Sequence, residues 1–198
     1  MNEVTLRKLD DDDIPELMRW IPDAEAADRW SGPFLRFPFT SETFREDLRL
    51  DQVDSWALVN RADDLIGFGQ VYERYGRNHL GRLAVHPDRR GGGLGHQLVA
   101  ALMQKGAEHP GLPEYGLYVY PGNEAALRCY RAAGFVAADD PGGDSETRRL
   151  DYCYMTARAT ARKGNCSRHV DPRYSTHRSL PAEQQQTRET AGRGNHVE

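Results

Sequence analysis

A glycine-rich turn between a strand and a helix constrains this chain more than any other feature. The segment is GRLAVHPDRRGGGLGHQLVAAL, residues 81–102, and apolar residues recur at helical spacing from Leu94 onward. Glycine lets backbone N–H groups approach an anion closely, and successive N–H groups in such a turn form a concave anion site. The helix that follows adds the positive end of its dipole. The pattern therefore predicts a phosphate or pyrophosphate bound at residues 90–96.

Two common phosphate-binding motifs do not fit this turn. The dinucleotide fingerprint needs G-x-G-x-x-G after the first strand, and a P-loop needs Gly-Lys-Ser/Thr. The run from Arg90 to Gly95 instead has the form (Gln/Arg)-x-x-Gly-x-(Gly/Ala), which resembles the pyrophosphate loop of the GNAT superfamily of acetyl-CoA-dependent N-acetyltransferases. The segment YGLYVYPGNEAALRCYRAAGF, residues 115–135, resembles the next strand and helix of that family, with landmarks at Asn123, Tyr130 and Gly134.

The remaining sequence alternates short strands and helices. Apolar patterning predicts strands at 4–9, 55–60, 65–73, 78–86, 115–120, 135–138 and 150–156, and helices from Asp13, at 41–50, up to about 108 after the glycine turn, and from Asn123. The aromatic, Pro- and Gly-rich stretch 20–39 predicts an irregular loop. The resemblance implies an acetyltransferase domain over residues 1–156, whereas 157–198 lack apolar periodicity, which is typical of a disordered tail.

Composition excludes several classes of protein. The chain of 198 residues has no apolar run long enough for a membrane span, and its acidic N-terminus does not resemble a signal peptide, so we expect a cytoplasmic protein away from membranes. Its three cysteines have no metal-ligand spacing, which predicts free thiols and no metal. No basic patch indicates nucleic-acid binding.

The resemblance covers residues 3–156 and implies an α/β (α+β) GNAT fold: a mixed sheet of six or seven strands with helices on both faces. Two parallel strands, 78–86 and 115–120, splay apart and hold acetyl-CoA as co-substrate. The residues that would contact it lie on the first strand, in the glycine turn and on the later helix: Leu83, Ala84, Val85, Arg90, Gly91, Gly92, Gly93, Leu94, Gly95, His96, Asn123 and Tyr130. A backbone N–H near Val85 would polarise the acetyl carbonyl.

The implied activity is transfer of an acetyl group to a primary amine by direct attack in a ternary complex. The alternative is a non-catalytic module that binds or senses acyl-CoA. The acceptor would be a small molecule or a peptide N-terminus, bound by residues 20–40 and 139–149. Trp30, Phe34 and Phe37 line its pocket or simply cover the core. The resemblance is compatible with a monomer or a homodimer.

Proton transfer needs two groups, because an alkylamine is mostly protonated at pH 7 and the leaving thiolate must gain a proton. The resemblance makes Tyr130 the general acid. Candidate bases are His79, placed by two-residue alternation on the strand face of Leu83 and Val85, and Glu73. In other family members the base lies where this chain has Tyr118, which has no carboxylate. A water chain without a single base is a further alternative.

Overall fold

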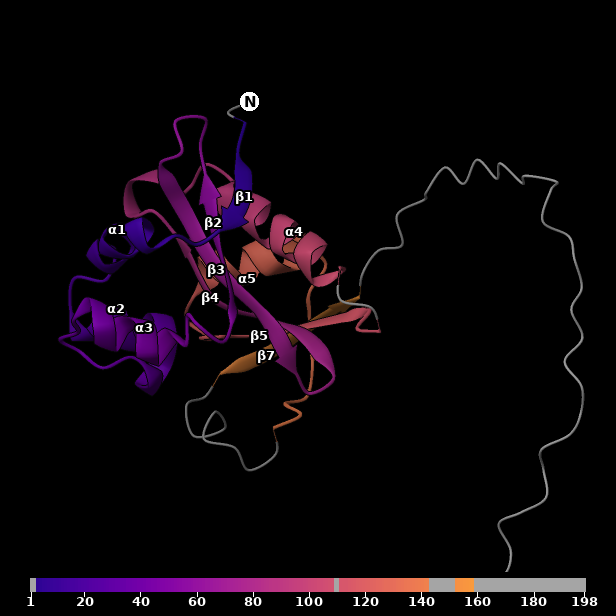
Figure 1. Cartoon of the computed structure of the whole chain (residues 1–198). Helices are drawn as coiled ribbons and strands as arrows, with labels where there is room; N and C mark the ends of the chain where they lie inside the picture. Colours follow the sequence, from indigo (N-terminus) through magenta and orange to yellow (C-terminus); the bar gives the residue numbers. More distant parts are fainter. Residues whose placement is uncertain (1–2, 109–110, 143–151, 159–198) are drawn as a thin grey trace, which may run out of the picture. The chain divides into compact units, whose positions relative to one another are not determined.

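The structure is a computed structural model that describes residues 3–108, 111–142 and 152–158 (Figure 1). These residues belong to one unit, Met1–Thr160. The expected tail lies outside the described residues from 159 onward, and residues 157 and 158 belong to the last strand. Within the described part, no helix has the length and apolarity that crossing a membrane requires.

A seven-stranded sheet organises the unit, in the order β1-β2-β3-β4-β5-β7-β6. Strands β4 and β5 are parallel, and the other neighbours are antiparallel. The expected mixed sheet is therefore confirmed, with each strand close to its predicted place. The strands are β1 (Thr5–Lys8), β2 (Asp54–Val59), β3 (Leu65–Arg74), β4 (Arg77–Val85), β5 (Glu114–Val119), β6 (Val136–Ala137) and β7 (Cys153–Arg158).

Helices cover both faces of the sheet (Figure 1). In β2, Leu58 packs with α4 and α5 residues in one apolar core, which we call the α4 core, whereas its neighbour Ala57 packs with α1 and α3 residues in the α3 core. Successive strand residues point to opposite faces, so the two cores lie on opposite sides of the sheet. The helices are α1 (Ile14–Arg19), α2 (Ala24–Ser31), α3 (Ser41–Leu48), α4 (Leu94–Gly106) and α5 (Glu124–Ala132).

The expected irregular loop at 20–39 is wrong for its first half, because α2 occupies residues 24–31. The side chain of Asp23 accepts a hydrogen bond from the Ala26 N–H at 2.8 Å and caps the helix. Gly32, with φ of 63°, ends it, and Pro33 follows. The alanine-rich, capped stretch is a good helix former, so the aromatic residues around it do not prevent helix formation.

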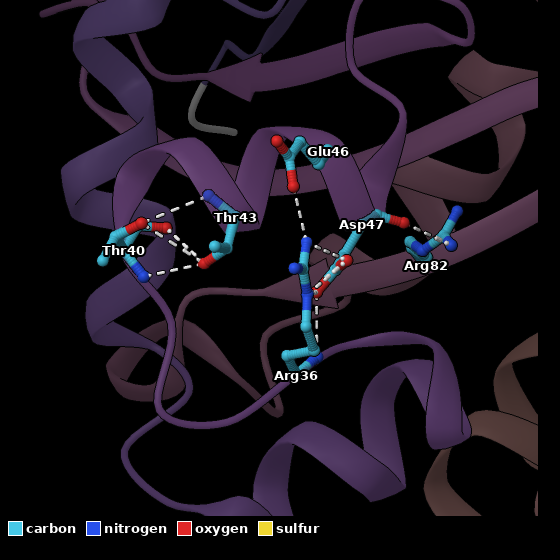
Figure 2. Close-up of polar contacts among 6 residues, drawn as sticks. All are labelled: Arg36, Thr40, Thr43, Glu46, Asp47 and Arg82. Atoms are coloured by element: carbon cyan, nitrogen blue, oxygen red, sulfur yellow. Dashed lines mark hydrogen bonds and ion pairs between the residues drawn. The ribbon is translucent and has the colours of Figure 1, made fainter.

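Asp47 connects α3 to its surroundings through both its side-chain carboxylate and its backbone carbonyl (Figure 2). Its carboxylate accepts hydrogen bonds from the Arg36 backbone N–H at 2.9 Å and from the Arg36 guanidinium, which holds the pKa of Asp47 below its usual range. Its carbonyl oxygen accepts from Arg82 of β4 at 3.2 Å. At the other end of α3, Thr40 and Thr43 form a reciprocal capping box. The helix is therefore connected to the segment before it and to Arg82 of β4.

A β-bulge in β4 changes which side chains share a face. Phe68 of β3 pairs with Ala84, but Gln70 pairs with Gly81, so β4 carries one extra residue between these pairs. Arg82 lies in the bulge with φ of 51°. The expectation that His79 shares a face with Leu83 and Val85 is therefore wrong: both pack against the α4 core, whereas the His79 ring lies beside Tyr72 on the opposite face.

Strands β4 and β5 separate after a short stretch of pairing. Their parallel register contains only Asn78 with Tyr115 and His79 with Gly116. Beyond these residues β4 continues to Val85 and β5 to Val119. The expected splayed parallel pair is confirmed.

Candidate active site

A groove with a volume of about 2060 Å³ opens where β4 and β5 separate. Its walls come from α1, α2, the ends of α3 and β3, most of β4, the glycine-rich turn, the first turns of α4, the end of β5 and α5. Because it lies between two separated strands, residues from both faces of the sheet line it. The groove can therefore hold two molecules that approach from opposite sides.

On the edge of β4 that faces β5, some backbone N–H and C=O groups do not form hydrogen bonds to a neighbouring strand in the described part of the chain. The His86 N–H donates to Ile66 of β3 at 3.0 Å, so by alternation the polar backbone groups of Leu83 and Val85 face the other way. Side chains donate to their carbonyl oxygens: Trp30 Nε1 to Leu83 and Arg90 Nε to Val85, both at 3.2 Å. These two residues can pair with an extended, amide-containing ligand. Ala84 also lines the groove.

The glycine turn leaves the start of α4 without a side-chain cap. Gly91 and Gly93 both have φ of 82°, and Gly93 is the N-cap of the helix. No acidic residue occupies the first turn of α4, so its free N–H groups favour an anion. The groove is lined by most residues predicted here, namely Arg90, Gly91, Gly93, Leu94, Gly95 and His96; Gly92 is not among the lining residues.

Helix α5 brings the predicted acid to the groove. Asn123 caps α5 by accepting from the Ala126 N–H at 3.1 Å, and Tyr130 lies two turns later, packed against the α4 core and the ring of Phe135. Both Asn123 and Tyr130 line the groove. Burial raises the pKa of Tyr130 above its ordinary value, so the phenol stays protonated at neutral pH.

The face of the sheet opposite the α4 core has a row of aromatic rings that the sequence did not predict. The centroids of Tyr72 and His79 are 5.1 Å apart, those of His79 and Tyr118 are 5.5 Å apart, and those of Tyr118 and Tyr154 are 4.9 Å apart. We call these four residues the aromatic row. They come from β3, β4, β5 and β7, and only the strand pairing brings them together. Tyr152 adds a fifth ring near Tyr118.

The two candidate bases differ in environment. His79 is buried in the groove wall, its Nδ1 has no hydrogen-bond partner among the described residues, and burial together with Arg74 and Arg82 lowers its pKa to about 3. A histidine with that pKa is neutral at pH 7 but holds a captured proton poorly. Glu73 lines the groove and is exposed.

We expect His79 to make folding stability depend on pH. The unfolded chain binds a proton at this histidine near pH 6.5, whereas the folded chain resists protonation down to about pH 3. Stability from this group is complete above pH 6.5 and falls as the pH drops, by at most about 1.4 kcal/mol per pH unit. Chemical denaturation at pH 7, 6 and 5 gives the free energy of unfolding at each pH. This free energy should change less with pH in His79→Gln than in the wild type. His96→Gln, at an exposed histidine, is the control and should keep the wild-type pH dependence; equal pH dependence in all three proteins would contradict the prediction.

The three aromatic residues predicted to line the acceptor pocket lie in different environments. Trp30 lines the groove, stacks near Phe44 of the α3 core and donates to β4. Phe34 also lines the groove and is 43% exposed. Phe37 is not among the lining residues and packs against Phe39.

The fold and groove define a class: α/β proteins with a mixed sheet in which two parallel strands splay apart beside a groove. Comparison with known families agrees, since residues 21–135, more than half of the chain, match the acetyltransferase (GNAT) family. The chain belongs to this family.

Curated relatives include mycothiol acetyltransferases. The Streptomyces coelicolor protein is 33% identical over 113 residues, which cover 52% of this chain and 36% of the relative. The Salinispora tropica protein is 34% identical over 97 residues, covering 46% and 32%. The match therefore spans about a third of the length of these relatives.

Solved structures show the same fold. An aminoglycoside acetyltransferase AAC(6')-Ib in complex with coenzyme A has a TM-score of 0.58 at 23% identity, over 79% of this chain and 95% of that one. The spermidine N-acetyltransferase of Vibrio cholerae, in complex with CoA and spermine, has a TM-score of 0.61 at 15% identity, also over 79% and 95%.

Proposed function

We propose that the chain transfers an acetyl group from acetyl-CoA to a primary amine by direct attack in a ternary complex. The observation that carries this proposal is the groove through the sheet, with an uncapped glycine turn and a free strand edge on its donor side and the aromatic row on the other. Acetyl-CoA supplies the thioester that the amine attacks. Both substrates can be present together because they use different faces of the sheet.

The donor side fits an acyl-CoA. The carbonyl oxygens of Leu83 and Val85 already accept hydrogen bonds from side chains, so they can accept the same bonds from a pantetheine amide. The uncapped start of α4 offers N–H donors for a diphosphate. A backbone N–H near Val85 would stabilise the oxyanion, and Tyr130, protonated at neutral pH, would donate a proton to the departing thiolate.

The acceptor side favours an amine with apolar or cationic character. The aromatic row presents ring faces, which attract ammonium groups. Farther along the groove, the Tyr120 hydroxyl donates to Asp28 at 3.3 Å, and both residues line the groove. The named relatives act on or bind amines of different sizes, including spermidine and aminoglycosides. A small primary amine is therefore the proposed acceptor class.

An acetylation assay with a panel of amines tests the function. The panel contains spermidine, kanamycin, deacetylated mycothiol and a peptide with an N-terminal alanine, each incubated with acetyl-CoA and the full chain. We expect at least one acetylated product by mass spectrometry, formed in proportion to enzyme. Calorimetry that shows acetyl-CoA binding, with no product from any amine, would replace the enzyme with the acyl-CoA-binding module.

A further inference from the structure

Tyr118 occupies a distinctive place in the groove. It lies on β5 two residues beyond Gly116, the last residue of β5 that pairs with β4, so it follows the point where the strands separate. Its neighbours Leu117 and Val119 are buried in the α4 core, which places the Tyr118 ring on the opposite face, in the aromatic row. Tyr118 lines the groove.

The hydroxyl of Tyr118 is connected to a carboxylate. It donates to Asp140 Oδ1 at 2.6 Å, a short distance that is typical of a hydrogen bond to a charged acceptor. Asp140 belongs to the segment after β6, and the same oxygen accepts from the Gly142 backbone N–H at 2.8 Å. The turn thus aims the carboxylate at the phenol. A carboxylate therefore reaches the acceptor face from a different segment of the chain.

We propose that Tyr118 and Asp140 form a proton relay that takes the proton from the attacking amine; this inference rests on the acetyl transfer proposed above. Tyr118 is the group that touches the acceptor, and Asp140 acts through it. The relay gives the acceptor face a proton acceptor that His79 cannot supply, because a histidine with a pKa of about 3 does not retain a proton.

The relay balances atoms and charge. The ammonium form of the acceptor gives one N–H proton to Tyr118 Oη as the hydroxyl proton of Tyr118 moves to Asp140 Oδ1. The neutral amine nitrogen then forms its bond to the acetyl carbon and loses its remaining extra proton to water. The bond from the acetyl carbon to sulfur breaks, and the thiolate takes the proton of Tyr130. Asp140 then releases its proton to water, and Tyr130 regains one from water. No oxidant or further reactant is needed.

The groups around the relay support this direction of transfer. The Arg74 guanidinium lies 5.1 Å from the centre of the Tyr118 ring, so its positive charge stabilises negative charge that develops on the phenol. Among the described residues, the titratable rings that contact the Tyr118 ring include His79, Tyr152 and Tyr154. Burial raises the pKa values of Tyr152 and Tyr154, so both stay neutral at pH 7 and do not compete for the proton.

The test compares Tyr118→Phe, Asp140→Asn and the double variant with Asp12→Asn as the control. Asp12 is an exposed aspartate that does not line the groove and lies outside both expected acceptor segments. The substrate is the panel amine that the wild type acetylates fastest, and kcat and KM are measured from pH 6 to 10. Acetyl-CoA affinity, measured by calorimetry for every variant, reports any loss of folding or donor binding.

We expect each single variant to lower kcat by about 10²-fold at pH 7, with acetyl-CoA affinity unchanged. The double variant should be no slower than the singles, because both residues serve one proton path. The deficit should narrow toward pH 10, where an alkylamine arrives without its extra proton. Asp140→Glu should restore part of the rate, and Asp12→Asn should match the wild type.

Three results would overturn the relay: full kcat in Asp140→Asn, single losses that multiply in the double variant, or a deficit that stays constant across the pH range. These results are distinct from failure of the proposed function. If the wild type acetylates no amine, the function fails; if the wild type is active and the variants match it, only the relay fails.

Discussion

Tyr130→Phe is expected to lower kcat for acetyl transfer by about 10²-fold while leaving acetyl-CoA affinity nearly unchanged. The substitution removes only the hydroxyl and keeps the ring that packs beside Phe135 and the α4 core. Burial raises the pKa of Tyr130, so the wild-type phenol carries its proton throughout the neutral range. Steady-state kinetics with saturating acetyl-CoA, combined with calorimetry, separates the rate from the binding.

Cys129→Ala is the matched control, because Cys129 precedes Tyr130 on α5 and also lines the groove. Burial raises the pKa of the Cys129 thiol, which keeps it protonated and makes it a poor nucleophile. We expect this variant to keep wild-type activity. Wild-type kcat in Tyr130→Phe, or a large loss in Cys129→Ala, would remove the tyrosine from the role of acid.

Gly93→Val should weaken acetyl-CoA binding by roughly tenfold or more, which corresponds to about 1.4 kcal/mol. Gly93 has a φ of 82°, a left-handed conformation that a β-branched residue adopts only with strain. Apart from its own chain neighbours, no atom of the described residues lies within 4 Å of the position its Cβ would take, so the expected effect comes from the backbone rather than from a clash. A relaxed turn would point its N–H groups away from a diphosphate.

Gly111→Val separates this effect from general instability. Gly111 also has a left-handed φ, of 94°, and open space around its Cβ position, but it is not among the residues that line the groove. Both variants should lose stability in thermal denaturation, and only Gly93→Val should lose affinity in an acetyl-CoA titration. Equal affinities for the two variants would place the diphosphate elsewhere.

The donor half of the site could be predicted from sequence because it is built from contiguous segments. The strand, glycine turn and helix of residues 81–102 carry their own pattern, and the predicted elements follow it closely. Sequence patterns of this kind predict structure well, because glycine conformations and helix caps depend on nearby residues. The splayed strand pair was predicted by resemblance and is present.

The acceptor half could not be predicted, because it depends on long-range pairing and on one local irregularity. The bulge at Arg82 inverts the alternation of β4, and no residue type in the sequence marks it, since a positive φ is unusual for arginine. Tyr118 and Asp140 meet only because β5, β6 and β7 are neighbours in the sheet. Helix α2 was detectable: Asp23 before an alanine-rich run is a capping signal.

The bulge in β4 also has an evolutionary consequence. By shifting the alternation of the strand, it directs His79 to the face opposite Leu83, although the two residues would share a face in a regular strand. If the amine and the acyl donor bind on opposite faces, as proposed, substitutions in α1 to α3 would change the choice of amine without changing the residues that bind the acyl donor. One extra residue in one strand would thus allow recognition of the amine to change during evolution independently of recognition of the acyl donor.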